Sequence, residues 1–205
     1  MRKIEAALPT RRGPCRLFCW VPRPGEQPDI ALVFGDVHGC ERVTVRVQSE
    51  CLTGHVFQSL ACDCHGQLYD ALDLIAAEGC GVLVYLRQEG RGIGLVAKLD
   101  SYALQAQGMD TVDANAAVGH EADERSYDAA ARILDELGVR SVRLLSNNPG
   151  KSAALRTAGV VINDVLPLPP KVAPENQRYL ATKRDRLGHK LDLDAVIEPT
   201  HNLGS

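Results

Sequence analysis

The 205-residue chain has no apolar run long enough to cross a membrane or to act as a signal peptide. We therefore expect a cytoplasmic protein, with no membrane partner, whose cysteines stay reduced. The chain also has no excess of basic residues, since 23 Lys and Arg stand against 26 Asp and Glu, for a net charge of −3. Because binding along a nucleic acid requires a basic face that displaces counterions, this balance argues against a nucleic-acid partner. A small phosphate ligand needs only a few cations and remains compatible with it.

Internal repeats and low-complexity tracts are missing as well. The hydrophobic share of 45% and the charged share of 24% are those of an ordinary globular protein. The length suits one large domain or two small ones.

Apolar periodicity predicts antiparallel β-structure in the first part of the chain and alternating strands and helices in the second. It predicts strands at residues 15–21, 30–34, 43–48, 81–86, 139–145 and 160–162, with a turn that joins strands 30–34 and 43–48 into antiparallel structure. Helical spacing predicts helices at residues 67–78, 94–107 and 126–137, from 151, and at 175–187. Residues 111–124 are polar and lack a clear period, so we interpret them as an active-site loop. The fold class is therefore α/β, with a mixed sheet.

Three cysteines form the most informative pattern, a C-x10-C-x-C arrangement of Cys51, Cys62 and Cys64. Thiolates are strong zinc ligands, and the short C-x-C can supply two of them from one turn while Cys51 arrives from the end of a strand. Three thiolates leave one tetrahedral position for a water molecule, whose pKa the metal lowers to about 7. We interpret the pattern as a catalytic zinc site.

Two alternatives stay open for these cysteines. They could be small buried hydrophobic residues, or they could hold a structural zinc with a fourth ligand, for which His55, His65 and Cys80 are candidates. A disulfide is disfavoured because the cysteine count of seven is odd and the expected compartment is reducing.

Three polar segments lie next to predicted strands or helices. Residues 87–94, RQEGRGIG, leave a buried strand and open a helix, where free backbone N–H groups can bind an anion. Residues 146–152, SNNPGKS, repeat that arrangement, although Leu145 at the first glycine position excludes a P-loop. Residues 120–125, HEADER, combine acids, a base and a guanidinium, with a solvated surface as the alternative.

Together, the segments SECLTG (49–54), CDC (62–64), RQEGRGIGL (87–95), DER (123–125) and NNP (147–149) resemble GTP cyclohydrolase II, the enzyme that starts riboflavin synthesis. The resemblance implies a catalytic domain at residues 30–190. It would be preceded by a Pro-rich segment with one strand at residues 1–29 and followed by a tail at 191–205. It also implies a homodimer.

The resemblance further implies roles for individual residues. Zinc on the three cysteines activates water to attack C8 of guanine, so that formate is released, and magnesium accompanies the triphosphate, from which pyrophosphate is lost. Asp123 corresponds to a proton acceptor, Arg125 to a proposed nucleophile at the α-phosphorus, and Tyr102 lies beside the reacting base. The residues implied to contact GTP are Arg46, Val47, Gln48, Ser49, Glu50, Gln67, Glu89, Gly90, Arg91, Thr111, Ser146 and Lys151.

The chain departs from the family pattern at a few positions. Gln48 stands where the family often has histidine, Ser146 where threonine is common, and His65-Gly66 replaces the usual Gly-x after the third cysteine. A variant that stops at the formamidopyrimidine or serves secondary metabolism is therefore one alternative. A nucleotide-binding module with a structural zinc is another. A zinc deaminase would carry H-x-E and P-C-x-x-C, and neither is present.

Overall fold

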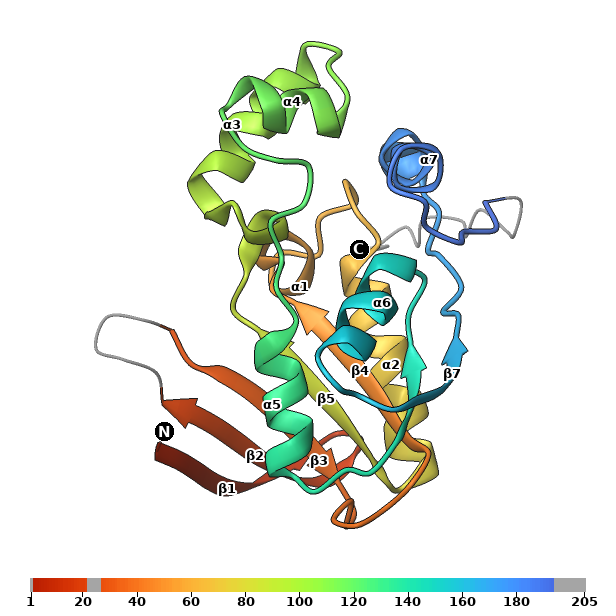
Figure 1. Ribbon diagram of the computed structural model, residues 1–205. Coiled ribbons are helices and arrows are strands. Elements are labelled where there is room, and N and C mark those ends of the chain that lie inside the picture. Colours follow the sequence, from red (N-terminus) through yellow and green to blue (C-terminus); the bar gives the residue numbers. More distant parts are fainter. Residues whose placement is uncertain (1, 22–26, 194–205) are drawn as a thin grey trace.

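A seven-stranded mixed sheet forms the centre of the computed structural model, which describes residues 2–21 and 27–193. The strands follow the order β1-β2-β3-β5-β4-β6-β7 across the sheet (Figure 1). Their bounds are Arg2–Thr10 (β1), Gly13–Val21 (β2), Asp29–Phe34 (β3), Val43–Ser49 (β4), Gly81–Leu86 (β5), Val142–Leu145 (β6) and Ile162–Leu166 (β7). The predicted α/β class with a mixed sheet is confirmed.

The N-terminal half of the sheet is antiparallel, with β1 against β2, β2 against β3, and β3 against β5. The prediction of a single strand in residues 1–29 is wrong, because β1 precedes the predicted one. Most of the β1 side chains are exposed on both faces of the sheet, so its sequence shows no apolar alternation that would have revealed it.

The other half of the sheet is parallel: β4 lies between β5 and β6, and β6 pairs with β7. The predicted antiparallel arrangement of strands 30–34 and 43–48 is wrong, since β5 inserts between β3 and β4. The reason is that β5 is apolar on both faces and gains most from a central position.

The helices are α1 (Leu52–His55), α2 (Cys64–Glu78), α3 (Gly94–Ala106), α4 (Thr111–Ala117), α5 (Asp128–Glu136), α6 (Pro149–Thr157) and α7 (Gln177–Asp185), with short 3-10 turns at Glu89–Gly92 (η1) and Pro174–Asn176 (η2). The predicted helices are confirmed with small shifts at their ends. The prediction of a loop over residues 111–124 is wrong for its first half, which is α4. The Asp110 side chain caps this helix by accepting hydrogen bonds from the backbone N–H groups of Val112 and Asp113.

Two hydrophobic cores lie on opposite faces of the sheet. On one face, Val45 and Val82 belong to the same core as Ile133 of α5 and Leu155 of α6. On the other, Leu83 belongs to the same core as Ile75 of α2. Figure 1 shows α5 in front of the sheet and α2 behind it. With both faces covered, the carboxyl ends of the parallel strands are the open edge at which a site can form.

Beyond β7 the chain forms η2 and α7, and Leu191 packs in a small core with Val172 and Leu180. Of the predicted tail, residues 191–193 are described, and residues 194–205 lie outside the described part of the chain.

Candidate metal and phosphate site

A cavity opens where the chain leaves the carboxyl ends of β4, β5 and β6. Of the eighteen residues predicted for the site, sixteen line it: Arg46, Gln48, Ser49, Glu50, Cys51, Cys62, Cys64, Gln67, Glu89, Gly90, Arg91, Tyr102, Thr111, Arg125, Ser146 and Lys151. The two exceptions are Val47 and Asp123. Val47 is fully buried in the core, and its carbonyl oxygen accepts a hydrogen bond from Lys151 Nζ at 2.5 Å. Asp123 forms an ion pair with Arg125, which does line the cavity.

The three predicted ligand cysteines come together at one end of this cavity. Cys51 precedes α1, and Cys64 is the first residue of α2, so two helix starts place the sulfurs. All three Sγ atoms lie within 4.8 Å of one another, and those of Cys51 and Cys62 are 3.8 Å apart. Two thiolates on one tetrahedral zinc, each at about 2.3 Å, lie about 3.8 Å apart. The donor set and its spacing fit zinc.

Gly54 in α1 allows the sulfurs to approach this closely. A Cβ atom at this position would lie 3.0 Å from Cys62 Sγ and 3.1 Å from Cys51 Sγ. A side chain here would therefore push against the ligand sulfurs, which explains why the helix beside the cluster carries a glycine.

The hydrogen bonds of His55, the first candidate for a fourth ligand, exclude it from that role. Arg46 Nε donates to Gln48 Oε1 at 2.8 Å, so the amide nitrogen of Gln48 faces His55 Nε2 at 3.1 Å as a donor. His55 Nδ1 accepts a hydrogen bond from the backbone N–H of Cys51 at 3.3 Å and lies 2.9 Å from the Tyr85 hydroxyl. Burial lowers the pKa of His55, which favours the neutral imidazole. Both ring nitrogens have partners within the protein, and His55 does not belong to the cluster of described residues that could hold a metal.

The other two candidates are no better placed. Cys80 precedes β5, at the strand end opposite the site, and its Sγ lies 3.4 Å from the carbonyl oxygen of Asp36. The His65 ring packs on Tyr69 with the centroids 4.4 Å apart. Among the described residues, the cluster able to hold a metal contains the three cysteines and no fourth member. This favours an open coordination position over a closed structural site.

Lys98 of α3, which was not predicted from the sequence, contacts the cysteine cluster directly. Its buried ammonium lies 3.3 Å from Cys51 Sγ, 3.0 Å from Thr53 Oγ1 and 2.8 Å from Glu89 Oε1. Hydrogen bonds from the other two cysteines and the charge of Lys98 hold the pKa of Cys51 below its ordinary value. The signal that could have revealed Lys98 is its place in the apolar stripe of a helix, three residues after Leu95 and four before Tyr102.

Cationic side chains line the cavity, both beside the cysteines and away from them. Six Lys and Arg residues line it against two glutamates, a strong local excess in a protein of net charge −3: Arg46, Arg91, Lys98, Arg125, Lys151 and Lys183. The two Nη atoms of Arg91 are buried without a hydrogen-bond partner. Such a buried guanidinium edge is suited to an anionic ligand, whose oxygens would supply acceptors.

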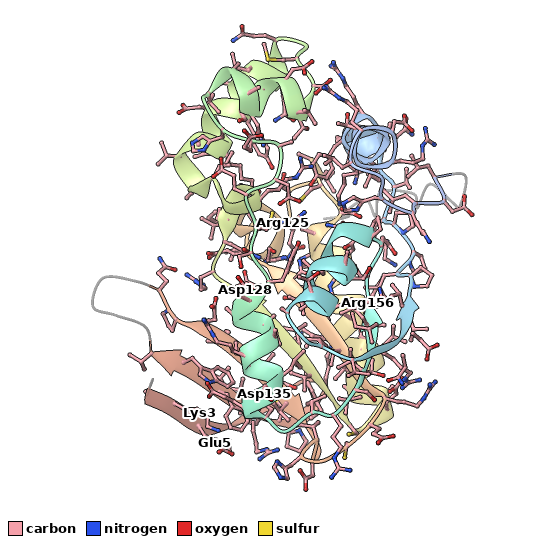
Figure 2. The ribbon with its side chains drawn as sticks, viewed as in Figure 1. Lys3, Glu5, Arg125, Asp128, Asp135 and Arg156 are labelled. Carbon is pink, nitrogen blue, oxygen red and sulfur yellow. The ribbon has the colours of Figure 1, made fainter. Side chains whose placement is uncertain are left out.

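Arg46 and Arg125 are held in place by neighbouring groups. Arg46 donates to the Leu145 carbonyl oxygen at 3.0 Å and to Gln67 Oε1 at 2.7 Å, and burial lowers its pKa to about 10. Arg125 Nε donates to Asp123 Oδ1 at 2.7 Å. Burial alone would lower the pKa of Arg125, but the paired carboxylate raises it above the usual value. Figure 2 shows Arg125 in the segment that leads into α5.

The polar turn after β6 has the predicted helix-start geometry. The Asn148 side chain caps α6 by accepting from the backbone N–H groups of Gly150 and Lys151, and the Ser146 hydroxyl accepts from Asn148 N at 3.1 Å. On the other side of the cavity, Glu50 pairs with Arg87 at 3.2 Å. The segments that the sequence singled out are therefore brought together around one cavity.

Three lining residues from the last part of the chain were not predicted: Tyr179, Lys183 and His189. They belong to α7 and the turn after it, a polar helix whose sequence has no feature that marks a ligand site. Ser101, Gln105 and Asn115 also line the cavity and were not predicted, whereas Ile93, Asn147 and Asn148 lie in predicted segments without having been named as site residues.

The cavity lies at the carboxyl ends of parallel strands, and it combines three clustered thiols with several cationic side chains. The class is therefore an α/β protein with a site suited to a metal ion and a phosphate group. The family model described as GTP cyclohydrolase II matches residues 1–167. The chain belongs to the GTP cyclohydrolase II family.

Relatives of this chain include riboflavin biosynthesis proteins named RibBA. That of Salinispora arenicola is 53% identical over 195 residues, which cover 95% of this chain and 46% of the relative. That of Bacillus subtilis is 50% identical over 191 residues, covering 93% and 48%. The chain thus spans about half the length of the curated relatives it matches. Among solved structures, RibBX, a two-domain 3,4-dihydroxy-2-butanone 4-phosphate synthase from A. baumannii, matches with a TM-score of 0.47 and 18% identity. The match covers 80% of this chain and 40% of that one.

Proposed function

We propose that this chain catalyses the GTP cyclohydrolase II reaction, the first step of riboflavin biosynthesis. The reaction hydrolyses GTP, opens the imidazole ring of guanine, and releases formate and pyrophosphate. The product is 2,5-diamino-6-ribosylamino-4(3H)-pyrimidinone 5′-phosphate. The observation that carries the proposal is the proximity of three clustered sulfurs and six cationic side chains in one cavity, in a chain of this family.

At one end of the cavity, Cys51, Cys62 and Cys64 would hold zinc. When bound, zinc would supply a water of lowered pKa as the nucleophile that a poorly electrophilic C8 requires. Tyr102 lines the same cavity, and burial raises its pKa to about 12. Its hydroxyl therefore stays protonated at neutral pH and can donate a hydrogen bond to the reacting base.

The cations of the cavity other than Lys98 and Lys183 would bind the triphosphate, which would carry a bound Mg²⁺ ion. Arg91 is the clearest candidate for a phosphate contact, because its two buried Nη atoms have no hydrogen-bond acceptor within the protein. Arg46 and Lys151 add charge from β4 and α6. The remaining implied contacts would position the base and the ribose. They are Gln48, Ser49, Glu50, Gln67, Glu89, Gly90, Thr111 and Ser146.

For pyrophosphate release we propose that Arg125 stabilises the charge that develops at the α-phosphorus while Asp123 accepts a proton. The pairing of Arg125 with Asp123 and its raised pKa support a permanently charged guanidinium. Covalent attack by Arg125, which the resemblance implies, requires loss of that charge and is the alternative for this step.

Two further parts of the proposal concern the protein as a whole. A homodimer is proposed from the family, and the exposed apolar side chains of Val56, Phe57 and Val96 support an interface near α1 and α3. The reduced thiols that the chemistry needs suit the cytoplasm. In the part of the chain that the structure describes, none of the helices has the length and apolar character of a membrane span.

The test is an assay of the zinc-loaded protein with GTP and Mg²⁺, followed for formate, pyrophosphate and the diaminopyrimidine. Formate together with pyrophosphate supports the proposal. Ring opening without formate would show the variant that stops at the formamidopyrimidine. GTP binding without any product would instead support a nucleotide-binding module, and the proposal would then be wrong.

A further inference from the structure

Helix α7 lies beyond residue 167, where the family match ends, yet it spans the cavity. Toward one side, Arg178 donates to the carbonyl oxygen of Gly108, and Arg186 pairs with Asp110 and Asp113 at the start of α4. Figure 1 shows α7 opposite α3 and α4, above the end of the sheet that carries the site. The helix is thus anchored to the α3–α4 unit while its inner face meets the cavity.

Tyr179 on this inner face contacts Arg91. The guanidinium carbon lies 5.5 Å from the centroid of the partly buried Tyr179 ring. Arg91 has a left-handed backbone with φ of 63°, its carbonyl oxygen accepts from Glu124 N at 2.9 Å, and its Nη atoms have no partner. A ring on the guanidinium face leaves the N–H edge of Arg91 free to bind an anion.

Lys183, one turn further along α7, contacts Asp63 in the turn between Cys62 and Cys64. Its Nζ lies 3.0 Å from Oδ1 of Asp63, with the two side chains 10% and 0% exposed. Asp63 stands between Cys62 and Cys64, and its Oδ2 accepts from Gln67 Nε2 at 2.6 Å. Removal of one partner of a buried ion pair is strongly destabilising, because it leaves the other charge buried without compensation. Lys183 therefore holds the Asp63 carboxylate in place inside the turn that carries two of the predicted ligand sulfurs.

We propose that α7 completes the site through two positioning residues: Tyr179, which orients Arg91 toward a phosphate of the substrate, and Lys183, which holds the Cys62–Cys64 turn in its ligand geometry through Asp63. This inference rests on the proposed function for the identity of the substrate. The Lys183 part can be tested without any turnover.

The first experiment measures zinc release from the full-length holoprotein to a colorimetric chelator. Lys183→Met is expected to release zinc at least tenfold faster than the unmodified protein. Arg184→Met is the matched control, because Arg184 is its exposed neighbour on the same helix, and its rate should stay unchanged. Asp63→Asn, which is nearly isosteric, should match Lys183→Met, and the double variant should add little to either single change.

Unchanged zinc release in Lys183→Met, or equal acceleration in the Arg184→Met control, would overturn the role of Lys183. So would fully additive effects of the two substitutions, since Lys183 would then not act through Asp63. Asp63→Asn keeps the test decisive if Lys183→Met does not fold.

The second experiment compares Tyr179→Leu with Tyr179→Phe. Loss of the ring should raise the KM for GTP at least tenfold while kcat changes less than threefold, and phenylalanine should keep KM within twofold. Equal effects of the two substitutions, or a loss confined to kcat, would contradict the role of Tyr179. If the unmodified protein does not turn over GTP, the proposed function fails, and calorimetric Kd values for GTP must then show the same order of the variants for this inference to stand.

Discussion

The ammonium of Lys98 donates a hydrogen bond to Cys51 Sγ across 3.3 Å while it pairs with Glu89 at 2.8 Å. Three thiolates on one Zn²⁺ leave a net negative charge, and a buried lysine in contact with one of them offsets it. The lysine is therefore expected to stabilise the metal-bound state and to limit how much electron density Cys51 gives to the metal.

Replacement of Lys98 by methionine should weaken zinc binding by about 10- to 100-fold, because it removes a charged hydrogen bond to a ligand sulfur. Lys98→Arg, which keeps the charge, should lose less. Competition with a chelator of known affinity measures both effects. Equal zinc affinity in the unmodified protein and Lys98→Met would show that the contact has no role in metal binding.

Cys64→Ser should abolish zinc retention and ring opening, because two sulfurs do not hold zinc against a chelator as three do. Cys80→Ser is the control, since Cys80 lies at the opposite end of β5. Metal analysis by mass spectrometry and the formate assay follow the two variants. Unchanged formate release in Cys64→Ser would refute the metal assignment.

Arg125→Ala should reduce pyrophosphate release by about 10²- to 10³-fold, the usual loss when a group that stabilises transition-state charge is removed. Arg156→Ala is a suitable control, because Arg156 is exposed near the end of α6 (Figure 2). The time course of pyrophosphate release from GTP gives the rates of both variants. If pyrophosphate is released equally fast by the two variants, Arg125 has no part in that step.

Stability in the absence of nucleotide should fall between pH 7 and pH 5 because of His189. Burial and the nearby cations Lys183, Arg125, Arg91 and Lys151 lower its pKa to about 3. The unfolded chain, with a His pKa of about 6.5, binds a proton in this pH range that the folded chain does not, so acidification favours unfolding.

Because His189 is partly exposed, we expect a loss of about 1 kcal/mol in the free energy of unfolding from this group. Urea unfolding at pH 7 and pH 5 measures it. His189→Asn should show a smaller loss over the same interval, and an identical pH dependence in the two proteins would contradict the assignment.

Local pattern was enough to predict the parts of the site that form within one segment. The C-x-C turn lies where it was predicted, and α6 starts at Pro149, two residues before the predicted start at Lys151, because each is set by a few neighbouring residues. The position of β5 between β3 and β4 is a long-range choice that periodicity does not encode. Tyr179 and Lys183 were missed for the same reason, since their partners lie far away in the sequence.

The central place of β4 has a consequence for how the protein reaches its folded state. Val43 of β4 pairs in parallel with Val142 of β6, so about one hundred residues must be ordered before this ladder closes. Pairings of such long range make folding slow. The ligand cysteines, in contrast, lie within fourteen residues of one another and are synthesised long before β6. If zinc binds as proposed, we therefore expect the nascent chain to bind the metal before it can bind a nucleotide.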